Sequence, residues 1–260
     1  VIIPTIGTRR GNAPARLVDE AVRTLRDAEK ITPLQIIAVT TGPIDVIRGV
    51  DKQVVYETSN GFNFAEAINL GRTLATGAYL LILNDDTTAD FSDPVTRLLE
   101  IGQREGVGAV GAKLTYPDGR LQHAGIVLLP SGPTHVHIAK PGDFPGYFGS
   151  TLTPRNYFAV TAAAMLTPTA VFDELGGFDR SFARDFNDVD YCLRLQAAGY
   201  RVAWTPYAHL THHEGASLTR KAADSAELAA FRERWAQLYE VDPFYSPALS
   251  DQLERLYEVR

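Results

Sequence analysis

Short apolar runs alternate with helical patterns through the first third of the chain. The runs predict strands over residues 1–3, 34–39, 54–56 and 79–83. Apolar positions at helical spacing predict helices over residues 17–25 and 64–74. This strand–helix alternation predicts an α/β fold with a doubly wound, mostly parallel central sheet flanked by helices.

The pattern changes after a third predicted helix at residues 94–105. A strand at 107–114, a tight turn at 116–119 and a returning strand at 121–129 predict a small antiparallel hairpin. Residues 130–154, rich in Gly, Pro and His, predict a long surface loop. The remaining predicted elements are strands at 160–166 and 200–204 and helices at 168–175, 188–198 and 222–239.

Composition and charge are those of an ordinary folded protein. Apolar residues make up 45% and charged residues 22% of the 260 residues, and the formal net charge is -6. Because the chain has no dense cluster of Lys and Arg, its composition argues against nucleic acid as the main partner. No apolar run approaches the roughly 20 residues that a transmembrane segment needs.

Cys192 is the single cysteine, which excludes an intramolecular disulfide framework and fits a reducing compartment such as the cytoplasm. It falls inside the helical pattern at residues 188–198. We therefore expect a small buried hydrophobe at this position rather than a nucleophile.

The polar sequence Asn84-Asp85-Asp86 directly follows the fully apolar run at 79–83. Ligands of open α/β sheets bind where parallel strands end. Two adjacent carboxylates repel each other unless they share a cation or a proton, and hard oxygen ligands suit Mg²⁺ or Mn²⁺. Asn, Asp and Thr are equally typical of turns and helix starts, so this segment alone fits a metal site and a structural turn.

A second acidic cluster, with Asp185, Asp188 and Asp190, opens the helix predicted at residues 188–198. Acidic residues at a helix start are favoured by the helix dipole alone. A carboxylate fixed at a helix start is also a well-oriented general base, and three aspartates in six residues exceed what a helix start requires.

His212 and His213 follow the strand predicted at residues 200–204. Neighbouring residues on a strand point in opposite directions, so at most one of the two is expected to be a metal ligand. One helix and one strand separate Asp188 from His212 and return the chain to the same edge of the sheet. That return makes joint metal binding by His212 and Asp86 feasible.

These clusters occur in the order typical of family 2 glycosyltransferases with the GT-A fold, and the chain resembles that family from Val1 to about Arg220. The resemblance rests on an ordered set of motifs: Val1-Ile2-Ile3-Pro4-Thr5, Gly61-Phe62-Asn63-Phe64, Asn84-Asp85-Asp86-Thr87, Tyr116-Pro117-Asp118-Gly119, Leu175-Gly176-Gly177-Phe178-Asp179, Asn187-Asp188-Val189-Asp190 and Ala198-Gly199-Tyr200. Each motif is weak alone, whereas their order is specific.

The resemblance implies an inverting, metal-dependent hexosyltransferase that needs Mn²⁺ or Mg²⁺. It implies a catalytic domain over residues 1–220 and a C-terminal helical extension over residues 221–260 packed on it. The donor would be a nucleoside-diphosphate sugar of the UDP or dTDP type, and the acceptor a glycan or a lipid-linked glycan. The motifs around Phe62 and Tyr116 resemble rhamnosyl-type transferases that build bacterial surface polysaccharides. We expect a cytoplasmic location, with peripheral association at the inner face of the plasma membrane left open.

The same resemblance implies a role for each matching residue. Asp188 would deprotonate the acceptor hydroxyl, and Asp86 and His212 would hold the metal, with His213 as the alternative ligand. The residues implied on the nucleotide-sugar side are Pro4, Thr5, Thr40, Asn63, Asn69, Asn84 and Asp85. The residues implied on the acceptor or sugar side are Ala162, Asn187, His123 and His213.

Two departures from the family pattern bear on these roles. After the second strand the family usually has an Asp that reads the nucleobase, whereas this chain has Thr40-Thr41-Gly42-Pro43. Asn84 and Asn187 replace acidic residues of the metal and base motifs, and the key carboxylates remain.

Two other functions stay open. One is a catalytically inactive nucleotide-sugar-binding domain of a larger synthase, which the retention of Asp188 argues against. The other is a nucleotidyltransferase, for which the segment from Gly7 to Gly11 imitates the required basic, Gly-rich loop only in part.

Overall fold

The apolar runs that predict strands lie side by side in one mixed sheet. A computed structural model describes residues 1–11, 13–58, 61–213, 225–238, 242–252 and 255–260. Its strands are β1 (Ile2–Thr5), β2 (Ile37–Thr41), β3 (Lys52–Tyr56), β4 (Tyr79–Leu83), β5 (Thr87–Thr88), β6 (Val107–Thr115), β7 (Leu121–His123), β8 (Ile126–Leu129), β9 (Gly132–His135), β10 (Arg155–Asn156), β11 (Ala164–Pro168) and β12 (Arg201–His212). In the described residues the main sheet has the order β10-β12-β6-β11-β4-β1-β2-β3, with β5 paired to β12 and β7 to β6.

The expected mostly parallel sheet is confirmed. Strands β3, β2, β1 and β4 run parallel, β11 is antiparallel to both β4 and β6, and β6 and β12 run parallel to each other. The carboxyl ends of β1, β2, β4, β6 and β12 therefore share one edge, and β11 begins there. This edge collects polar side chains from distant parts of the sequence.

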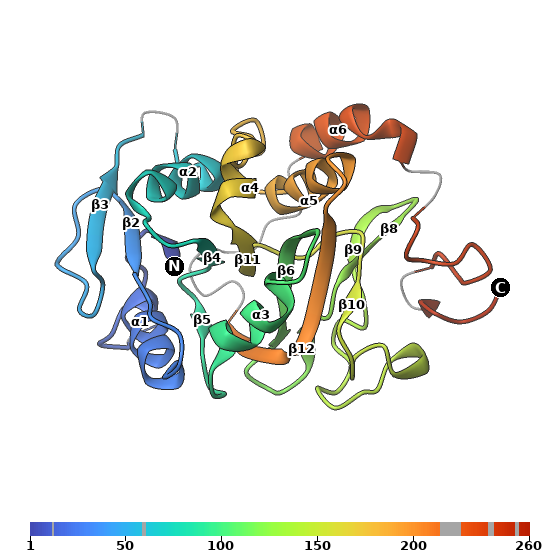
Figure 1. Ribbon diagram of the computed structural model, residues 1–260, viewed down its shortest axis with the longest axis horizontal. Helices are drawn as coiled ribbons and strands as arrows, with labels where there is room; N and C mark the ends of the chain where they lie inside the picture. Colours follow the sequence, from blue (N-terminus) through green and yellow to red (C-terminus); the bar gives the residue numbers. More distant parts are fainter. Residues whose placement is uncertain (12, 59–60, 214–224, 239–241, 253–254) are drawn as a thin grey trace.

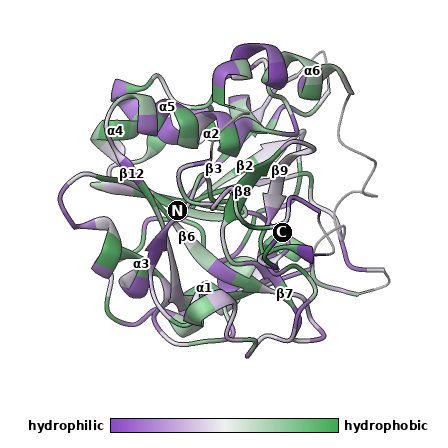
Figure 2. Cartoon of the chain, turned by 90° about the vertical axis from the view of Figure 1, so that its right-hand side faces the viewer, coloured by the Kyte–Doolittle hydropathy of each residue, from purple (hydrophilic) through white to green (hydrophobic). Residues whose placement is uncertain are grey.

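Helices cover both faces of the sheet and bury its apolar residues in two clusters. The helices are α1 (Leu17–Ala28), α2 (Phe64–Leu74), α3 (Pro94–Gly102), α4 (Thr169–Glu174), α5 (Asn187–Ala197) and α6 (Ser225–Arg234), with 3-10 turns η1 (Tyr147–Gly149) and η2 (Ala236–Leu238). Figure 1 shows α2, α4 and α5 on one side of the sheet and α1 and α3 on the other. Ile68 and Phe172 belong to the first cluster, and Leu25 and Leu98 to the second. Figure 2 shows that the helices contain both hydrophobic and hydrophilic segments, as expected for helices with one buried face.

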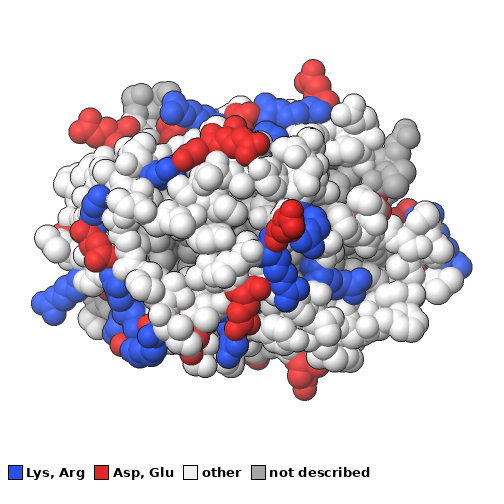
Figure 3. Space-filling view, viewed as in Figure 1, with Lys and Arg blue, Asp and Glu red and all other residues white. Residues whose placement is uncertain are grey.

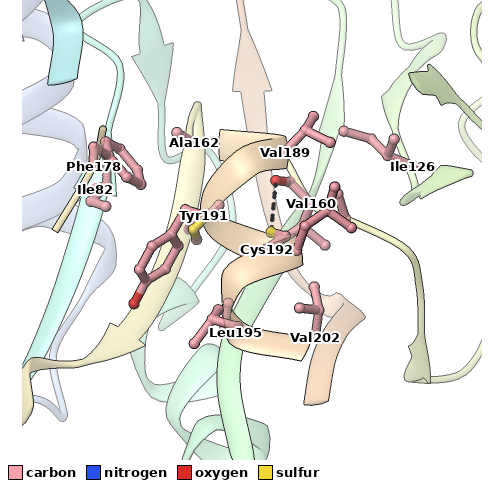
Figure 4. Close-up of a cluster of buried hydrophobic side chains, with 14 of the residues drawn as sticks. Ile82, Ile126, Val160, Ala162, Phe178, Val189, Tyr191, Cys192, Leu195 and Val202 are labelled. Atoms are coloured by element: carbon pink, nitrogen blue, oxygen red, sulfur yellow. Dashed lines mark hydrogen bonds between the residues drawn. The ribbon is translucent and has the colours of Figure 1, made fainter. Parts of the chain in front are cut away.

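Cys192 lies at the centre of the first cluster, as expected for a small buried hydrophobe. Its side chain is fully buried, and Sγ lies 3.7 Å from the carbonyl oxygen of Val160. Figure 4 shows it among Tyr191, Leu195 and Val202. Burial raises the pKa of this thiol far above its usual value, which makes it inert as a nucleophile.

The hairpin predicted at residues 107–129 forms, but its second strand is broken. The expected strand at 121–129 divides into β7, which pairs with β6, and β8, which pairs with β9 in a separate two-stranded sheet. Gly125 causes the break, because its φ is +112° and the Tyr157 ring lies 2.3 Å from where a Cβ would stand. The loop predicted at 130–154 also contains β9 and η1.

The last strand is longer than the pattern predicts. The expected strand at 200–204 continues as β12 to His212, past Pro206. The pairing of β12 with β6 shifts its register between Thr205 and His209, and a bulge of this kind is where proline is tolerated inside a sheet.

The C-terminal helix predicted at 222–239 is described as α6 and η2. Residues 222–224 and 239, like the boundary at residue 220 and Glu214, lie outside the described residues, so the division into two domains stays a prediction. Within the described chain, no helix combines the length and the apolar character that crossing a membrane requires.

A close contact between α2 and the sheet gives a stability prediction. A Cβ at Gly71 would lie 2.5 Å from Ile2 Cγ2 and 3.0 Å from Val39 Cγ2. We expect Gly71→Ala to lower the free energy of unfolding by about 1–3 kcal/mol in urea titrations, because overpacking outweighs the helix propensity of alanine. The control Thr73→Ala, at an exposed position of the same helix, should change it by less than about 0.5 kcal/mol. A Gly71→Ala protein as stable as the parent would contradict this packing.

Candidate active site

A cavity of about 260 Å³ opens at the carboxyl edge of the sheet. Predicted site residues from four separate segments line it: Pro4, Thr5, Asn84, Asp85, Ala162, Asn187 and Asp188. The remaining lining residues are Ile6, Phe62, Phe64, Thr161, Ala163, Arg184 and Asp185. Charged side chains on the face seen in Figure 3 are of both signs and are separated by broad uncharged areas. Among the cavity residues, Asp85, Asp185 and Asp188 carry acidic side chains and Arg184 a basic one.

The acidic loop after β4 is held by neighbouring strands. The backbone N–H of Asn84 donates to the carbonyl oxygen of Ala163 at 3.0 Å, and the Thr5 hydroxyl donates to Asp85 Oδ2 at 2.6 Å. Burial, together with the charge of Asp86, raises the pKa of Asp85 to about 7, although the Thr5 hydrogen bond lowers it. A buried carboxyl with such a pKa ionises readily once a cation approaches.

Asp86 and His212 lie in direct contact beside the cavity. Strand β5 pairs with the end of β12 so that Thr87 faces His212 across the ladder. This pairing places His212 Nε2 3.0 Å from Asp86 Oδ1 and 3.4 Å from Asn84 Nδ2. Burial would raise the pKa of Asp86, but the hydrogen bond and charge of His212 outweigh it and lower that pKa.

His213 points away from this contact. Its backbone N–H donates to the carbonyl oxygen of Asp86 at 2.8 Å, and its Nε2 lies 3.1 Å from the Thr88 hydroxyl. The two histidines thus face different partners, as neighbouring strand residues do.

The Asp86–His212 pair fits a divalent metal. Two ligands of an octahedral ion, each about 2.1 Å from it and at right angles, are about 3.0 Å apart, close to the separation seen here. Nε2 of His212 is the nitrogen that faces Asp86 and would bind the metal, whereas the buried Nδ1 has no hydrogen-bond partner among the described residues. The described residues hold no group of three His, Cys, Asp or Glu side chains that could bind a metal, so substrate oxygens and water would have to complete the shell.

Asp188 lines the same cavity from the start of α5. Its Oδ2 accepts from the backbone N–H of Ala162 at 3.0 Å, and its Oδ1 accepts from the backbone N–H of Val189 at 2.8 Å. Both carboxylate oxygens are therefore oriented by backbone groups. Each oxygen keeps a lone pair, and the side chain borders the cavity.

The segment before α5 is fixed by the C-terminal helix. The Glu227 carboxylate of α6 accepts backbone hydrogen bonds from Ala183 at 3.1 Å, from Arg184 at 3.3 Å and from Asp185 at 2.7 Å. Asn187 is buried and donates to the carbonyl oxygen of Arg184 at 3.2 Å. Glu227 therefore positions a cavity wall without lining the cavity.

Besides Asp86, His212 and His213, four further predicted residues do not line the cavity. Asn63 caps α2 by accepting from Glu66 N at 3.0 Å, and Asn69 exchanges two hydrogen bonds with the backbone of Phe178. The Thr40 hydroxyl donates to the carbonyl oxygen of Gly42 at 3.1 Å. His123 is fully buried, which lowers its pKa far below the usual value, and its Nε2 lies 3.5 Å from the Thr161 backbone nitrogen. The implied roles of these residues remain predictions.

Two residues, one lining the cavity and one at the neighbouring end of β2, were given no role from the sequence. Arg184 brings a positive charge to the cavity wall. Thr41, at the end of β2, has a buried hydroxyl without a hydrogen-bond partner in the described part of the chain. The alternation of strand residues could have indicated Thr41, because Thr40 and Thr41 must face opposite sides of the sheet. A single arginine in a loop, such as Arg184, shows no pattern in the sequence that would indicate its position.

The fold is that of GT-A glycosyltransferases, which confirms the fold that the motifs implied. Over 238 residues the chain is 37% identical to the uncharacterized protein y4gI of Sinorhizobium fredii, covering 85% of this chain and 26% of that protein. It is also 37% identical over 218 residues to the O-antigen biosynthesis protein RfbC of Myxococcus xanthus, covering 77% of this chain and 16% of RfbC. The chain thus spans 26% of the length of one relative and 16% of the other. No protein-family model matches it.

Three solved structures share the fold at low sequence identity. The mannosyltransferase PcManGT of Pyrobaculum calidifontis, in complex with GDP-Man and Mn²⁺, superposes with a TM-score of 0.53 at 18% identity, covering 91% of this chain and 60% of that chain. GalNAc-T7 with UDP, GalNAc and Mn²⁺ gives a TM-score of 0.66 at 12% identity, covering 92% and 48%. TarS of S. aureus gives 0.55 at 11% identity, covering 81% and 36%.

The contact between α6 and the cavity wall gives a testable prediction. Glu227→Ala removes the acceptor of three backbone N–H groups, and we expect a loss of roughly 1–3 kcal/mol in unfolding free energy. Hydrogen exchange at the amides of residues 183–185 should accelerate in the same variant. Glu233→Ala, at an exposed position on α6, is the matched control and should leave both measurements unchanged. Unaltered protection at residues 183–185 in Glu227→Ala would refute the positioning role.

Proposed function

We propose that this chain transfers a sugar from a nucleoside-diphosphate sugar to a hydroxyl group of a glycan or lipid-linked glycan, with inversion at the anomeric carbon. The observation that carries the proposal is the convergence of Asp188 and Asp85 on one cavity, with the Asp86–His212 contact at its side. The GT-A fold and the relative that acts in O-antigen biosynthesis support a hexosyltransferase of bacterial surface-polysaccharide synthesis.

Asp188 serves as the general base in the proposed reaction. Its carboxylate takes the proton from the acceptor hydroxyl while that oxygen forms a bond to the anomeric carbon. The bond from this carbon to the diphosphate oxygen breaks, and the electron pair leaves with the nucleoside diphosphate. One displacement inverts the configuration, and no covalent enzyme intermediate forms.

The negative charge that develops on the leaving diphosphate needs a positive charge close to it. Asp86 and His212 would hold a divalent cation, Mn²⁺ or Mg²⁺, which supplies positive charge to the diphosphate oxygens when bound. Arg184 adds a second positive charge at the cavity wall. Mn²⁺ in the PcManGT and GalNAc-T7 structures supports this assignment.

The nucleoside is expected to extend beyond the cavity. A volume of about 260 Å³ falls below the range of about 300–1,000 Å³ typical of small-molecule sites, so the cavity suits a sugar better than a whole nucleotide sugar. The ends of β1 and β2 lie next to it, where the buried Thr41 hydroxyl has no partner among the described residues. We propose a donor of the UDP or dTDP type, with Thr41 on its nucleoside side.

The base assignment predicts a selective loss of turnover. Asp188→Asn keeps the shape of the side chain but cannot accept the proton, so kcat should fall by about 10²- to 10⁴-fold. The dissociation constant of the nucleotide-sugar donor, measured by calorimetry, should stay within about twofold, since no donor contact is lost. Asp173→Asn, which breaks a surface ion pair with Arg72, is the control and should retain activity. Full transferase activity in Asp188→Asn would eliminate Asp188 as the base.

The metal assignment predicts a dependence of donor binding on cation. Mn²⁺ together with UDP or dTDP should raise the melting temperature of the parent protein in a thermal-shift screen. Asp86→Ala should abolish the part of this shift that requires Mn²⁺, because one of two protein ligands is gone. If no nucleotide or nucleotide sugar stabilises the parent in a way that depends on Mn²⁺, the catalytically inactive domain becomes the better description.

A further inference from the structure

A second cavity, of about 300 Å³, lies between the 137–147 loop and the C-terminal segment. It is lined by His137, Ile138, Lys140, Phe144, Gly146, Tyr147, Leu256, Tyr257 and Glu258. None of these residues lines the cavity that contains Asp188. Both η1 and the C-terminal end lie toward the β10 side of the sheet (Figure 1). We refer to this feature as the aromatic pocket.

A stack of rings forms one wall of the aromatic pocket. The Tyr257 ring lies between His137 and Tyr147, with centroid distances of 4.7 and 5.5 Å and nearly parallel planes. Phe148 contacts Tyr147 edge to face at 4.7 Å and ends the stack. The exposed fraction is 37% for Tyr147 and 92% for Phe148, so the stack presents aromatic surface to solvent. The wall is therefore packed at Tyr257 and exposed at Phe148.

Backbone strain is concentrated around this pocket. Non-glycine residues with positive φ in the described chain are Asp93, His137, Ala139, Phe148, Phe186 and Tyr257. Four of these six belong to the pocket or border it. A left-handed conformation costs a bulky residue roughly 1–3 kcal/mol, and such strain collects at binding and catalytic sites. Phe148 is both strained and almost fully exposed, so packing within the described chain does not account for it.

Polar groups complete the lining. Lys140 Nζ lies 5.9 Å from the Phe144 ring centroid, and Glu258 lies on the other side of the pocket in the C-terminal segment. Burial and the charges of Arg155 and Lys140 lower the pKa of His137 to about 4, so its imidazole is neutral at pH 7. An aromatic surface with separate hydrogen-bonding groups complements a sugar ring, which has an apolar C–H face and a polar hydroxyl rim.

The aromatic pocket is linked to the candidate active site through strand β7. Leu121 exchanges backbone hydrogen bonds with residues 139 and 140 at 2.8 and 2.7 Å. At the other end of β7, His123 contacts the backbone nitrogen of Thr161, which lines the cavity that contains Asp188. Leu121 and His123 are two strand positions apart, about 7 Å. The two cavities share no lining residue, so a ligand that occupies both must extend beyond either one.

We propose that the aromatic pocket binds a distal sugar of a glycan acceptor chain, with an apolar sugar face on the Tyr147–Phe148 end of the ring stack and its hydroxyls toward Lys140 and Glu258. This inference rests on the proposed function and adds that the acceptor is an oligosaccharide or longer chain. The pocket contributes acceptor affinity, whereas Asp188 and the acidic loop perform the transfer.

Binding without turnover tests the pocket independently of the transfer reaction. Saturation-transfer NMR with rhamnose- and mannose-containing oligosaccharides, from monosaccharide to hexasaccharide, should show binding that strengthens with length. Phe148→Ala and Tyr147→Ala should each weaken binding of the hexasaccharide by about tenfold. Tyr147→Phe keeps the ring and should bind like the parent. Val55→Ala, on the edge strand at the opposite end of the sheet, controls for general surface effects.

Several outcomes would overturn the proposal. Equal hexasaccharide binding by the parent, Phe148→Ala and Tyr147→Ala would show that the rings make no sugar contact, and the absence of binding by the parent would do the same. A parent dimer that Phe148→Ala converts to a monomer in sedimentation would assign the rings to self-association instead. Because Phe148 is 92% exposed, its replacement should not unfold the chain. Failure of Mn²⁺-dependent nucleotide binding would affect only the proposed function, since the oligosaccharide measurement needs no donor.

Discussion

Backbone groups of two adjacent residues, Ala162 and Ala163, hold the two halves of the candidate site together. The Ala162 N–H binds the Asp188 carboxylate, and the Ala163 carbonyl accepts from the Asn84 N–H, both at 3.0 Å. These bonds depend on where the backbone runs, which the antiparallel insertion of β11 between β4 and β6 determines. The small alanine side chains leave the space between the walls open. The sheet topology therefore determines the distance between Asp188 and the acidic loop that begins at Asn84.

The sequence predicts most of the fold because its strands are short, apolar and separated by helices with one apolar face. The sequence pattern gives the wrong strand ends where the backbone conformation, and not the alternation of side chains, determines them. The apolar run at residues 121–129 looks continuous, but Gly125 takes a conformation that ends β7 and lets the Tyr157 ring approach. A proline such as Pro206 is typical of the end of a strand. Here it lies in a bulge, and β12 continues beyond it to His212. That extension is what brings His212 to Asp86.

The candidate site is predictable where its residues follow strand ends or open a helix, as Asp85, Asp86 and Asp188 do. Residues positioned by long-range packing are not predictable in this way. Glu227 lies far along the chain in a charged helix, and only the fold shows that its carboxylate binds the backbone beside the cavity. Asn69 is the opposite case, a residue that the motif places at the site. In the structure its side chain forms hydrogen bonds with the backbone of Phe178 and so joins α2 to that segment.

The C-terminal helix also restrains the base through a buried charge on α5. Asp190 is fully buried and accepts from Arg194 at 2.8 Å, from Arg234 at 3.0 Å and from Trp235 Nε1 at 3.1 Å. Breaking a buried ion pair by removing one partner costs about 3–5 kcal/mol, because a buried charge is left uncompensated. Helix α5 therefore cannot slide or rotate without breaking these bonds, and Asp188 lies only two residues earlier. A helix that never touches the cavity thus fixes both the wall before Asp188 and the helix that carries it.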